Sequence, residues 1–487
     1  MNPTDAAATD LTAIRARLQR SAGPVASRRA IGLASINVGA DALDALPGEV
    51  RNALHAGSDG DIVVITDATP MRRGDGDPKA DALATLRSAF GRDRVRHAVI
   101  GRPGAGLHAD VAALAEADAA VVGAAVVVSI GSGTITDVAK DAAFRAGVPQ
   151  VVVQTAVSVN AFSDDMAVLL RDGVKRTVPS AWPRALVIDL RLIADAPAAM
   201  NRAGFGELTA MFTAPADWYL ASAVAGDGTF DPGVVALFRD RGERLLGSAA
   251  GVASGELGAL EELAAQMTLT GIAMGVAGRT APLSGTEHTI SHLLDMAAES
   301  DGRATAFHGA QVGVAAVIVA LAWRRVLRDL DPTRIAKAAT AGTPVDLAVR
   351  HDRVAAAFDR LDADGAATAE CWADHARKVE RWNDGLGRRA ALARQWGEHR
   401  AVLRGLVLAP ERIVEGLRAA GAPTRFSELD PAIPPEVARW AVASCHLMRD
   451  RFTVADLVDL TGATGHGWDE TFADELLAEA AQLGAGL

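Results

Sequence analysis

The chain has little cysteine: only Cys371 and Cys445 occur among its 487 residues. Two cysteines cannot build a disulfide framework, and this spacing fits neither a zinc ribbon nor a Cys-x-x-Cys redox motif. The scarcity of cysteine therefore favours a reducing compartment, and we expect a cytoplasmic protein.

A basic cluster and a long apolar run are also missing. The formal net charge is −11, which argues against nucleic acids and anionic membranes as partners because both bind positive surfaces. The longest apolar stretches, such as residues 119–128, fall short of the ~20 residues that span a membrane. The first residues mix Asp and Arg and contain no apolar signal core. We expect no nucleic-acid partner, no membrane partner and no targeting segment.

What is abundant is aliphatic: 49% of the residues are hydrophobic and only 4% are aromatic. A chain of 487 residues exceeds what one hydrophobic core usually serves. Residues 1–29 are Arg/Ala-rich and predict a helical extension, which we interpret as a surface appendage or a dimer arm. Residues 30–194 and 195–487 differ in pattern and predict two domains.

Within residues 30–194, short β-branched runs alternate with helical segments. This rhythm predicts βαβ units and a doubly wound, mainly parallel sheet, the architecture of a dinucleotide-binding α/β domain. The runs expected as strands are residues 30–39, 61–67, 95–100, 125–130, 151–154 and 185–189. Beyond residue 195 the strand signals vanish, and amphipathic segments separated by Gly/Pro breaks predict an all-helical second domain.

Two features predict where a nucleotide binds. The strand at 125–130 runs into Gly131-Ser132-Gly133-Thr134 and then a helix, whose N-terminal N–H groups favour a pyrophosphate that glycine lets approach closely. Asp67 ends an earlier strand, where a carboxylate can accept hydrogen bonds from an adenosine ribose. A tight turn and a capping aspartate are the alternative interpretation.

Histidines predict a second site. In a helix, His288 and His292 lie one turn apart on one face, and His308 opens the next apolar run. Imidazole is a common metal ligand and also a common hydrogen-bonding core group, so the spacing alone leaves both possibilities open.

Four segments, taken together, resemble the sn-glycerol-1-phosphate dehydrogenases, in their bacterial branch, within the iron-containing alcohol dehydrogenase and dehydroquinate-synthase-like superfamily. The resemblance extends from about residue 30 to about residue 462. The segments are GSGTITDVAK (131–140), AGFGEL (203–208), SGTEH (284–288) and HGAQVG (308–313). The resemblance implies a dinucleotide, NAD or NADP, between the domains, one divalent zinc, nickel or iron ion, and a homodimer.

The resemblance also implies roles for particular residues. The metal ligands would be Glu207, His288 and His308. His292 would lie next to the metal as a proton relay and not as a ligand, and Asn160 would line the substrate cleft with it as a second catalytic residue. The cofactor would contact Asp67, Gly131, Ser132, Gly133, Thr134, Asp137, Thr155 and Ser158.

The sequence departs from the family at three positions expected to face the substrate. Glu207 stands where the dehydrogenases generally have Asp and the dehydroquinate synthases have Glu. Asn160-Ala161 replaces a typical Asp-Gly pair, and Ala281 stands where Arg is common. These changes predict that glycerol 1-phosphate and dihydroxyacetone phosphate are not the best substrates, unless Arg279 or Lys175 supplies the missing positive charge.

The function expected from these observations is a metal-dependent NAD(P) oxidoreductase that interconverts a small polyol or polyol phosphate and its ketone. Asp67 predicts a preference for NAD, because a carboxylate repels a 2′-phosphate. Glu207 keeps open a dehydroquinate-synthase-like lyase with catalytic NAD. A non-catalytic nucleotide-binding protein that retained the fold is a third hypothesis, which the intact set of one carboxylate and two histidines disfavours.

Overall fold

The computed structural model describes residues 9–55, 57–104, 106–171, 174–340, 344–361, 365–462, 465 and 467–487. The chain forms two compact units. The first comprises Met1–Phe205 and Pro232–Thr280, and the second comprises Gly206–Asp231 and Ala281–Leu487. Strands end near residue 190, as predicted, but the compact units do not divide at residue 195, because the helices of Pro232–Thr280 pack with the first unit.

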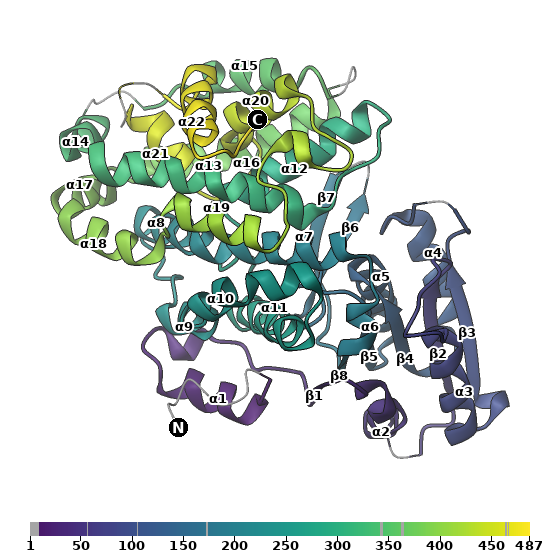
Figure 1. Cartoon of the computed structure of the whole chain (residues 1–487). Helices are drawn as coiled ribbons and strands as arrows, with labels where there is room; N and C mark the ends of the chain where they lie inside the picture. Colours follow the sequence, from purple (N-terminus) through teal and green to yellow (C-terminus); the bar gives the residue numbers. More distant parts are fainter. Residues whose placement is uncertain are drawn as a thin grey trace. The chain divides into compact units, whose positions relative to one another are not determined.

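The first unit is built on a six-stranded parallel sheet with the strand order β1-β8-β5-β4-β2-β3 (Figure 1). Continuous β-branched runs form its central strands because both faces of a parallel sheet are covered. The strands are β1 (Ser35–Gly39), β2 (Asp61–Asp67), β3 (Val95–Ile100), β4 (Ala124–Gly131), β5 (Gln150–Gln154) and β8 (Ala185–Asp189).

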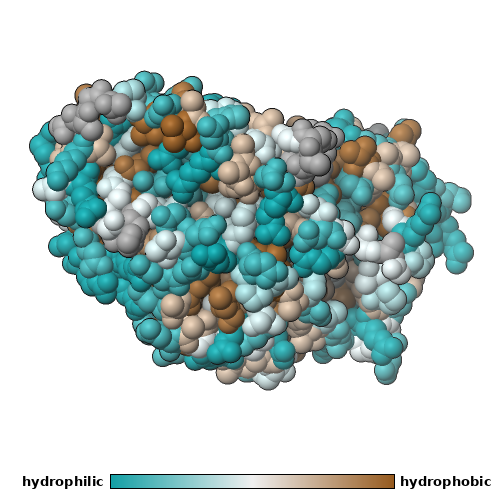
Figure 2. Space-filling model, turned by 90° about the horizontal axis from the view of Figure 1, so that it is seen from above, coloured by the Kyte–Doolittle hydropathy of each residue, from teal (hydrophilic) through white to brown (hydrophobic). Residues whose placement is uncertain are grey.

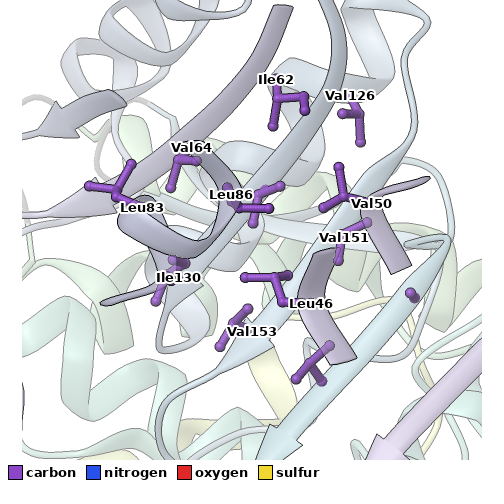
Figure 3. Packing of buried hydrophobic residues seen from close by; sticks show 14 of the residues in the cluster. Leu46, Val50, Ile62, Val64, Leu83, Leu86, Val126, Ile130, Val151 and Val153 are labelled. Atoms are coloured by element: carbon purple, nitrogen blue, oxygen red, sulfur yellow. The ribbon is translucent and has the colours of Figure 1, made fainter. Parts of the chain in front are cut away.

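Alternate side chains of the strands enter two different cores. Ile62 and Val64 of β2 pack against helices α2 (Leu46–Ala53) and α3 (Pro78–Phe90), and Figure 3 shows Leu83 and Leu86 of α3 in this cluster. The intervening Val63 and Ile65 pack against α4 (Val111–Ala120) and α5 (Gly133–Ala146). The sheet is therefore doubly wound, as the sequence predicts.

The sheet order contains a topological switch point between β2 and β4. From β2 the chain passes through α3 to β3 on one side, and from β4 it passes through α5 to β5 on the other side. The register pairs Thr66 with Ile130, so β2 and β4 end at the same edge, at Asp67 and Gly131. Open α/β sheets bind their ligands at this kind of edge.

Three parts of the first unit differ from the prediction or add to it. An antiparallel hairpin of β6 (Met166–Arg171) and β7 (Val174–Pro179) was not predicted. Helix α1 (Leu11–Arg20) is not a free appendage, because its apolar face is buried and it packs against α9 (Pro232–Arg239); residues 1–8 lie outside the described part. The remaining helices are α6 (Leu190–Ala194), α10 (Gly242–Ser254) and α11 (Leu257–Ala277), with α7 (Ala198–Leu208) ending in the second unit.

The second unit is helical, and its described residues contain no strand longer than one isolated bridge. Helix α13 (His308–Asp329) is long and apolar enough to span a membrane, but most of it is buried inside this unit, as expected for a core helix. On the face in Figure 2, hydrophobic residues form small patches among hydrophilic ones. The helices are α8 (Ala214–Ala225), α12 (Thr286–Ser300), α13 (His308–Asp329), α14 (Pro332–Thr340), α15 (Leu347–Phe358), α16 (Ala366–Asp384), α17 (Leu386–Arg394), α18 (Trp396–Leu406), α19 (Pro410–Ala419), α20 (Pro435–Ser444), α21 (Val454–Thr461) and α22 (Glu470–Gln482).

Candidate metal centre

The end of α7 and the start of α13 pack closely against each other because glycine residues lie at the contact. A Cβ on Gly206 would lie 2.3 Å from the carbonyl oxygen of Gly309, and a Cβ on Gly313 would lie 3.0 Å from the Cα of Gly206. No larger residue fits at Gly206 without moving backbone, because its closest neighbour is a backbone carbonyl. This contact places Glu207 of α7 beside His308, the first residue of α13.

Three side chains predicted as metal ligands converge here. The Oε1 atom of Glu207 lies 3.4 Å from Nε2 of His288, and its Oε2 atom lies 3.8 Å from Nε2 of His308. One ligand atom from each residue lies within 4.8 Å of the other two. Two ligands that are each about 2.1 Å from a tetrahedral metal are roughly 3.4 Å apart, so the donor set fits a divalent ion. Three protein ligands also leave a coordination position for substrate.

Two carboxylates make this pocket strongly negative. Glu207 and Glu287 are buried, and Glu287 accepts hydrogen bonds from the Gly285 N–H (2.6 Å) and the Thr213 hydroxyl (2.9 Å). Although burial lowers the pKa of His288, Glu207 and Glu287 outweigh this effect and raise that pKa to about 9. The same negative potential favours a bound cation. The Oε1 atom of Glu287 also lies 3.0 Å from Nδ1 of His288 and accepts a hydrogen bond from its N–H, which leaves Nε2 facing Glu207.

A directional hydrogen-bond chain fixes the tautomer of His308. The amide Nε2 of Gln311 donates to Asp295 (3.0 Å), so its Oε1 is the atom that accepts from the Ser291 hydroxyl (2.7 Å). Because Ser291 gives its single proton to Gln311, it accepts from Nδ1–H of His308 at 2.9 Å. The Nε2 atom of His308 is therefore left with a lone pair for a metal. Neither Ser291 nor Gln311 was predicted from the sequence to act at the site.

Replacing Ser291 by alanine is expected to weaken metal binding by about 10- to 100-fold, the usual effect of losing a partner that orients a ligand. Without the hydroxyl, His308 loses the acceptor that selects its Nδ1–H tautomer. A competition titration against a chromophoric chelator measures the affinity. Ser300→Ala is the matched control, since the exposed Ser300 lies at the other end of α12. Equal affinities of Ser291→Ala and the wild-type protein would contradict the assigned tautomer.

His292 lies next to the three donors. Its ring centroid is 6.4 Å from that of His288 and 5.5 Å from that of His308, and it is not part of the set of three converging ligand atoms. That His292 relays protons without binding metal stays a prediction.

A buried aspartate that was not predicted from the sequence anchors α12. Asp217 of α8 accepts from the backbone N–H and the hydroxyl of Thr286, at 2.8 and 2.7 Å, and from the Val454 N–H at 2.9 Å. Burial and then the neighbouring Glu287 raise the pKa of Asp217 to about 7. Asp217 fixes the start of the helix that carries His288, from a position 69 residues earlier in the chain.

The residues predicted to bind a dinucleotide lie in the first unit, at the switch-point edge. Ser132 makes no side-chain cap to α5, and the first turn of α5 carries no acidic residue, so this helix N-terminus suits an anion. Packing also requires glycine at both positions. A Cβ on Gly131 would lie 2.5 Å from the Ile135 side chain, and a Cβ on Gly133 would lie 2.5 Å from the Val159 side chain.

The loop after β5 is held in place by its neighbours. The Thr155 N–H donates to the Gly131 carbonyl at 3.3 Å, and the Val157 N–H donates to the side chain of Asn201 at 3.0 Å. Thr155 and Ser158 are mostly buried in this loop, and Thr134 is half-buried near the start of α5. Asn201 was not predicted, because it belongs to a helix more than 40 residues further along the chain.

Asp137 has a structural role that the sequence did not reveal. Burial raises its pKa to about 8, and its Oδ1 atom lies 3.9 Å from the buried Lys140 ammonium. Lys140 in turn donates to the Ala161 carbonyl (2.6 Å), to Asp164 (2.6 Å) and to the Met166 carbonyl (2.7 Å). Lys140 therefore holds the segment that follows Asn160, while a cofactor contact of Asp137 rests on the resemblance alone.

The positions that depart from the family are divided between the units. Asn160 is half-buried in the first unit, and Ala281 is buried in the second. Arg279, one of the two proposed replacements for the missing positive charge, is exposed. Lys175 is the other proposed replacement, and its side chain is not among those that the structure describes.

Comparisons with known proteins agree with this fold. Residues 49–197 match the family model described as iron-containing alcohol dehydrogenase. A glycerol-1-phosphate dehydrogenase [NAD(P)+] of Bacillus licheniformis is 28% identical over 71% of this chain and 72% of that protein. Another, from Halalkalibacterium halodurans, is 32% identical over 43% of this chain and 53% of its own length, so that match spans about half of the relative. A crystal structure of a probable glycerol dehydrogenase from Sinorhizobium meliloti 1021 has the same fold, with a TM-score of 0.53 at 17% identity over 92% of this chain and 99% of that chain.

Proposed function

We propose that this chain is a member of the iron-containing alcohol dehydrogenases and a metal-dependent NAD(P) oxidoreductase that interconverts a small polyol, or polyol phosphate, and its ketone. The observation that carries the proposal is the convergence of Glu207, His288 and His308, with Nδ1 of each histidine held by a hydrogen-bond partner. We further propose zinc, nickel or iron as the metal, a homodimer as the assembly and the cytoplasm as the location, without nucleic-acid or membrane partners.

The chain's own residues would bind and orient the reactants. A bound divalent metal supplies Lewis-acid polarisation of the substrate oxygen, and a bound dinucleotide supplies the hydride exchange. Glu207, His288 and His308 would hold the ion with one anionic and two neutral donors. His292, whose ring centroid lies 5.5 Å from that of His308, is the candidate carrier of the hydroxyl proton. The α5 N-terminus and Asp67 would hold the pyrophosphate and the ribose.

The hypothesis of a dehydroquinate-synthase-like lyase was based on Glu207. The geometry of this residue does not favour a lyase over a dehydrogenase. The Glu207 carboxylate reaches toward both histidines, at 3.4 and 3.8 Å. This geometry supports the longer side chain as a ligand in a dehydrogenase too. Net consumption of reduced cofactor separates the two reactions, because only the oxidoreductase consumes it.

The proposed function predicts metal-dependent oxidation of NADH or NADPH by a ketone. We expect a ketone other than dihydroxyacetone phosphate to have the highest kcat/KM in a panel of polyol ketones and their phosphates, because Asn160 and Ala281 remove a charged acceptor and a cation. The panel is assayed with protein reconstituted with zinc, nickel, iron or manganese.

Asn160→Asp provides the matched variant, since the half-buried Asn160 accepts an isosteric carboxylate. This substitution is expected to shift the preference toward dihydroxyacetone phosphate by about tenfold or more. If dihydroxyacetone phosphate were already the best substrate of the wild-type protein, the substrate preference inferred here would be wrong. Absence of net cofactor oxidation with every ketone and metal would contradict the oxidoreductase itself.

A further inference from the structure

A buried lysine pairs with the carboxylate expected to read the cofactor ribose. Lys79, in the first turn of α3, donates from Nζ to Oδ1 of Asp67 at 2.7 Å. The same ammonium donates to the carbonyl oxygens of Asp67 at 2.7 Å and of Thr69 at 2.6 Å. These three acceptors match the three N–H groups of a lysine. Lys79 therefore cancels the charge of Asp67 and also clamps the loop that follows β2.

The pairing follows from how α3 begins. Asp77 caps the helix by accepting from the Lys79 and Ala80 N–H groups at 2.9 and 3.3 Å, and Pro78 occupies the first helical position. This start directs Lys79 back toward the end of β2. Only 11% of the Lys79 side chain and 15% of the Asp67 side chain remain exposed, so solvent screens the pair far less than an exposed ion pair.

Other cations near this edge have different partners. Arg73 donates from Nε to Asp189 (3.0 Å) and from Nη2 to Asp41 (2.7 Å). His97 on β3 lies 2.9 Å from the Thr66 hydroxyl, and burial together with the positive Arg87 and Lys79 lowers its pKa, which disfavours its charged form. Arg72 is exposed. Lys79 is thus the cation that the structure places in contact with Asp67.

We propose that Lys79 sets cofactor selectivity: by neutralising Asp67, it allows a dinucleotide with a 2′-phosphate to bind alongside one without it. An unpaired carboxylate at the end of β2 would repel the 2′-phosphate of NADP and accept the ribose hydroxyls of NAD. The ion pair removes most of that repulsion and leaves Oδ2 of Asp67 for a ribose hydroxyl. The NAD preference expected from Asp67 alone is therefore replaced by use of both cofactors. This inference rests on the proposed function, because it requires a dinucleotide at the switch point between β2 and β4.

The test compares dissociation constants for NADH and NADPH, measured with the metal-loaded protein by the fluorescence of the reduced nicotinamide. Lys79→Met is expected to raise the NADPH constant at least about tenfold more than the NADH constant, because it exposes a bare carboxylate to the 2′-phosphate. Lys79→Arg, which keeps the charge, should preserve the wild-type ratio. Asp67→Asn in the wild-type background should shift the ratio in favour of NADPH, since it leaves the charge of Lys79 uncompensated.

Arg72→Met is the matched control, an exposed cation of the same loop, and should leave the ratio within about twofold. Equal weakening of both cofactors in Lys79→Met, together with an unchanged ratio in Asp67→Asn, would reduce Lys79 to a loop clamp and overturn the selectivity role. A shift of the ratio in Arg72→Met would assign that role to Arg72 instead. Failure of the wild-type protein to bind either cofactor would overturn the proposed function itself, a result distinct from binding with an unaltered ratio.

Discussion

Replacing His288 or His308 by alanine is expected to give a folded protein without its metal and with turnover reduced about a thousandfold or more. Each histidine contributes one of three converging donors, at 3.4 and 3.8 Å from Glu207. A site that keeps only two protein ligands binds a divalent ion weakly. Without the metal, the enzyme loses Lewis-acid stabilisation of several kcal/mol. At about 1.4 kcal/mol for each factor of ten in rate, this accounts for the expected loss of turnover.

The measurement is metal content by mass spectrometry after exhaustive dialysis, with circular dichroism to confirm folding. His292→Ala is the control, because its ring lies beside the site without belonging to the three donors. It should retain metal in full and lose activity only. Full metal occupancy in His308→Ala would refute the ligand assignment, whatever happens to activity.

Replacing Gly206 by alanine is expected to have the second-largest effect. The new Cβ would lie 2.3 Å from the Gly309 carbonyl oxygen, so the end of α7 and the start of α13 must move apart. Overpacking of this kind destabilises proteins by about 1–3 kcal/mol. Because the movement also separates Glu207 from His308, metal affinity should fall by about 100-fold or more, as a displacement of order 1 Å suffices to spoil a preorganised site.

Gly405→Ala is the matched glycine substitution. Gly405 lies inside α18 of the same unit, and a Cβ there meets nothing within 4 Å. This variant should be slightly stabilised, by about 0.5–1 kcal/mol, through the higher helix propensity of alanine. Urea denaturation and metal titration on both variants separate the clash from the general effect of replacing glycine. A Gly206→Ala protein with wild-type metal affinity would show that the glycine contact does not position Glu207.

The sheet could be predicted because its central strands are buried on both faces. Residues 61–67 and 125–130 are continuous β-branched runs, and the structure forms β2 and β4 there. The hairpin of β6 and β7 was missed although its sequence carried a signal. The apolar run of β6 and the start of β7 are separated by Asp172-Gly173, a dipeptide typical of two-residue hairpin turns.

The metal site could be predicted only in part from local pattern. Helical spacing relates His288 to His292, but Glu207 lies 81 residues before His288 and no spacing rule connects them. Glu207 was predicted as a ligand only from the resemblance to a known family. Ser291, Gln311 and Lys79 were missed because their roles depend on which side chains meet in the folded chain, and serine, glutamine and lysine are common on helices for other reasons.

We expect one divalent ion to bind between Glu207, His288 and His308. The most direct test is a crystal structure of the zinc-loaded protein with anomalous diffraction recorded at the zinc edge. We expect a single strong anomalous peak per chain, about 2.0–2.2 Å from the Glu207 carboxylate and from Nε2 of both histidines. A fully loaded protein whose peak lies elsewhere, or whose zinc is held by Nδ1 of His288 or His308, would contradict this expectation.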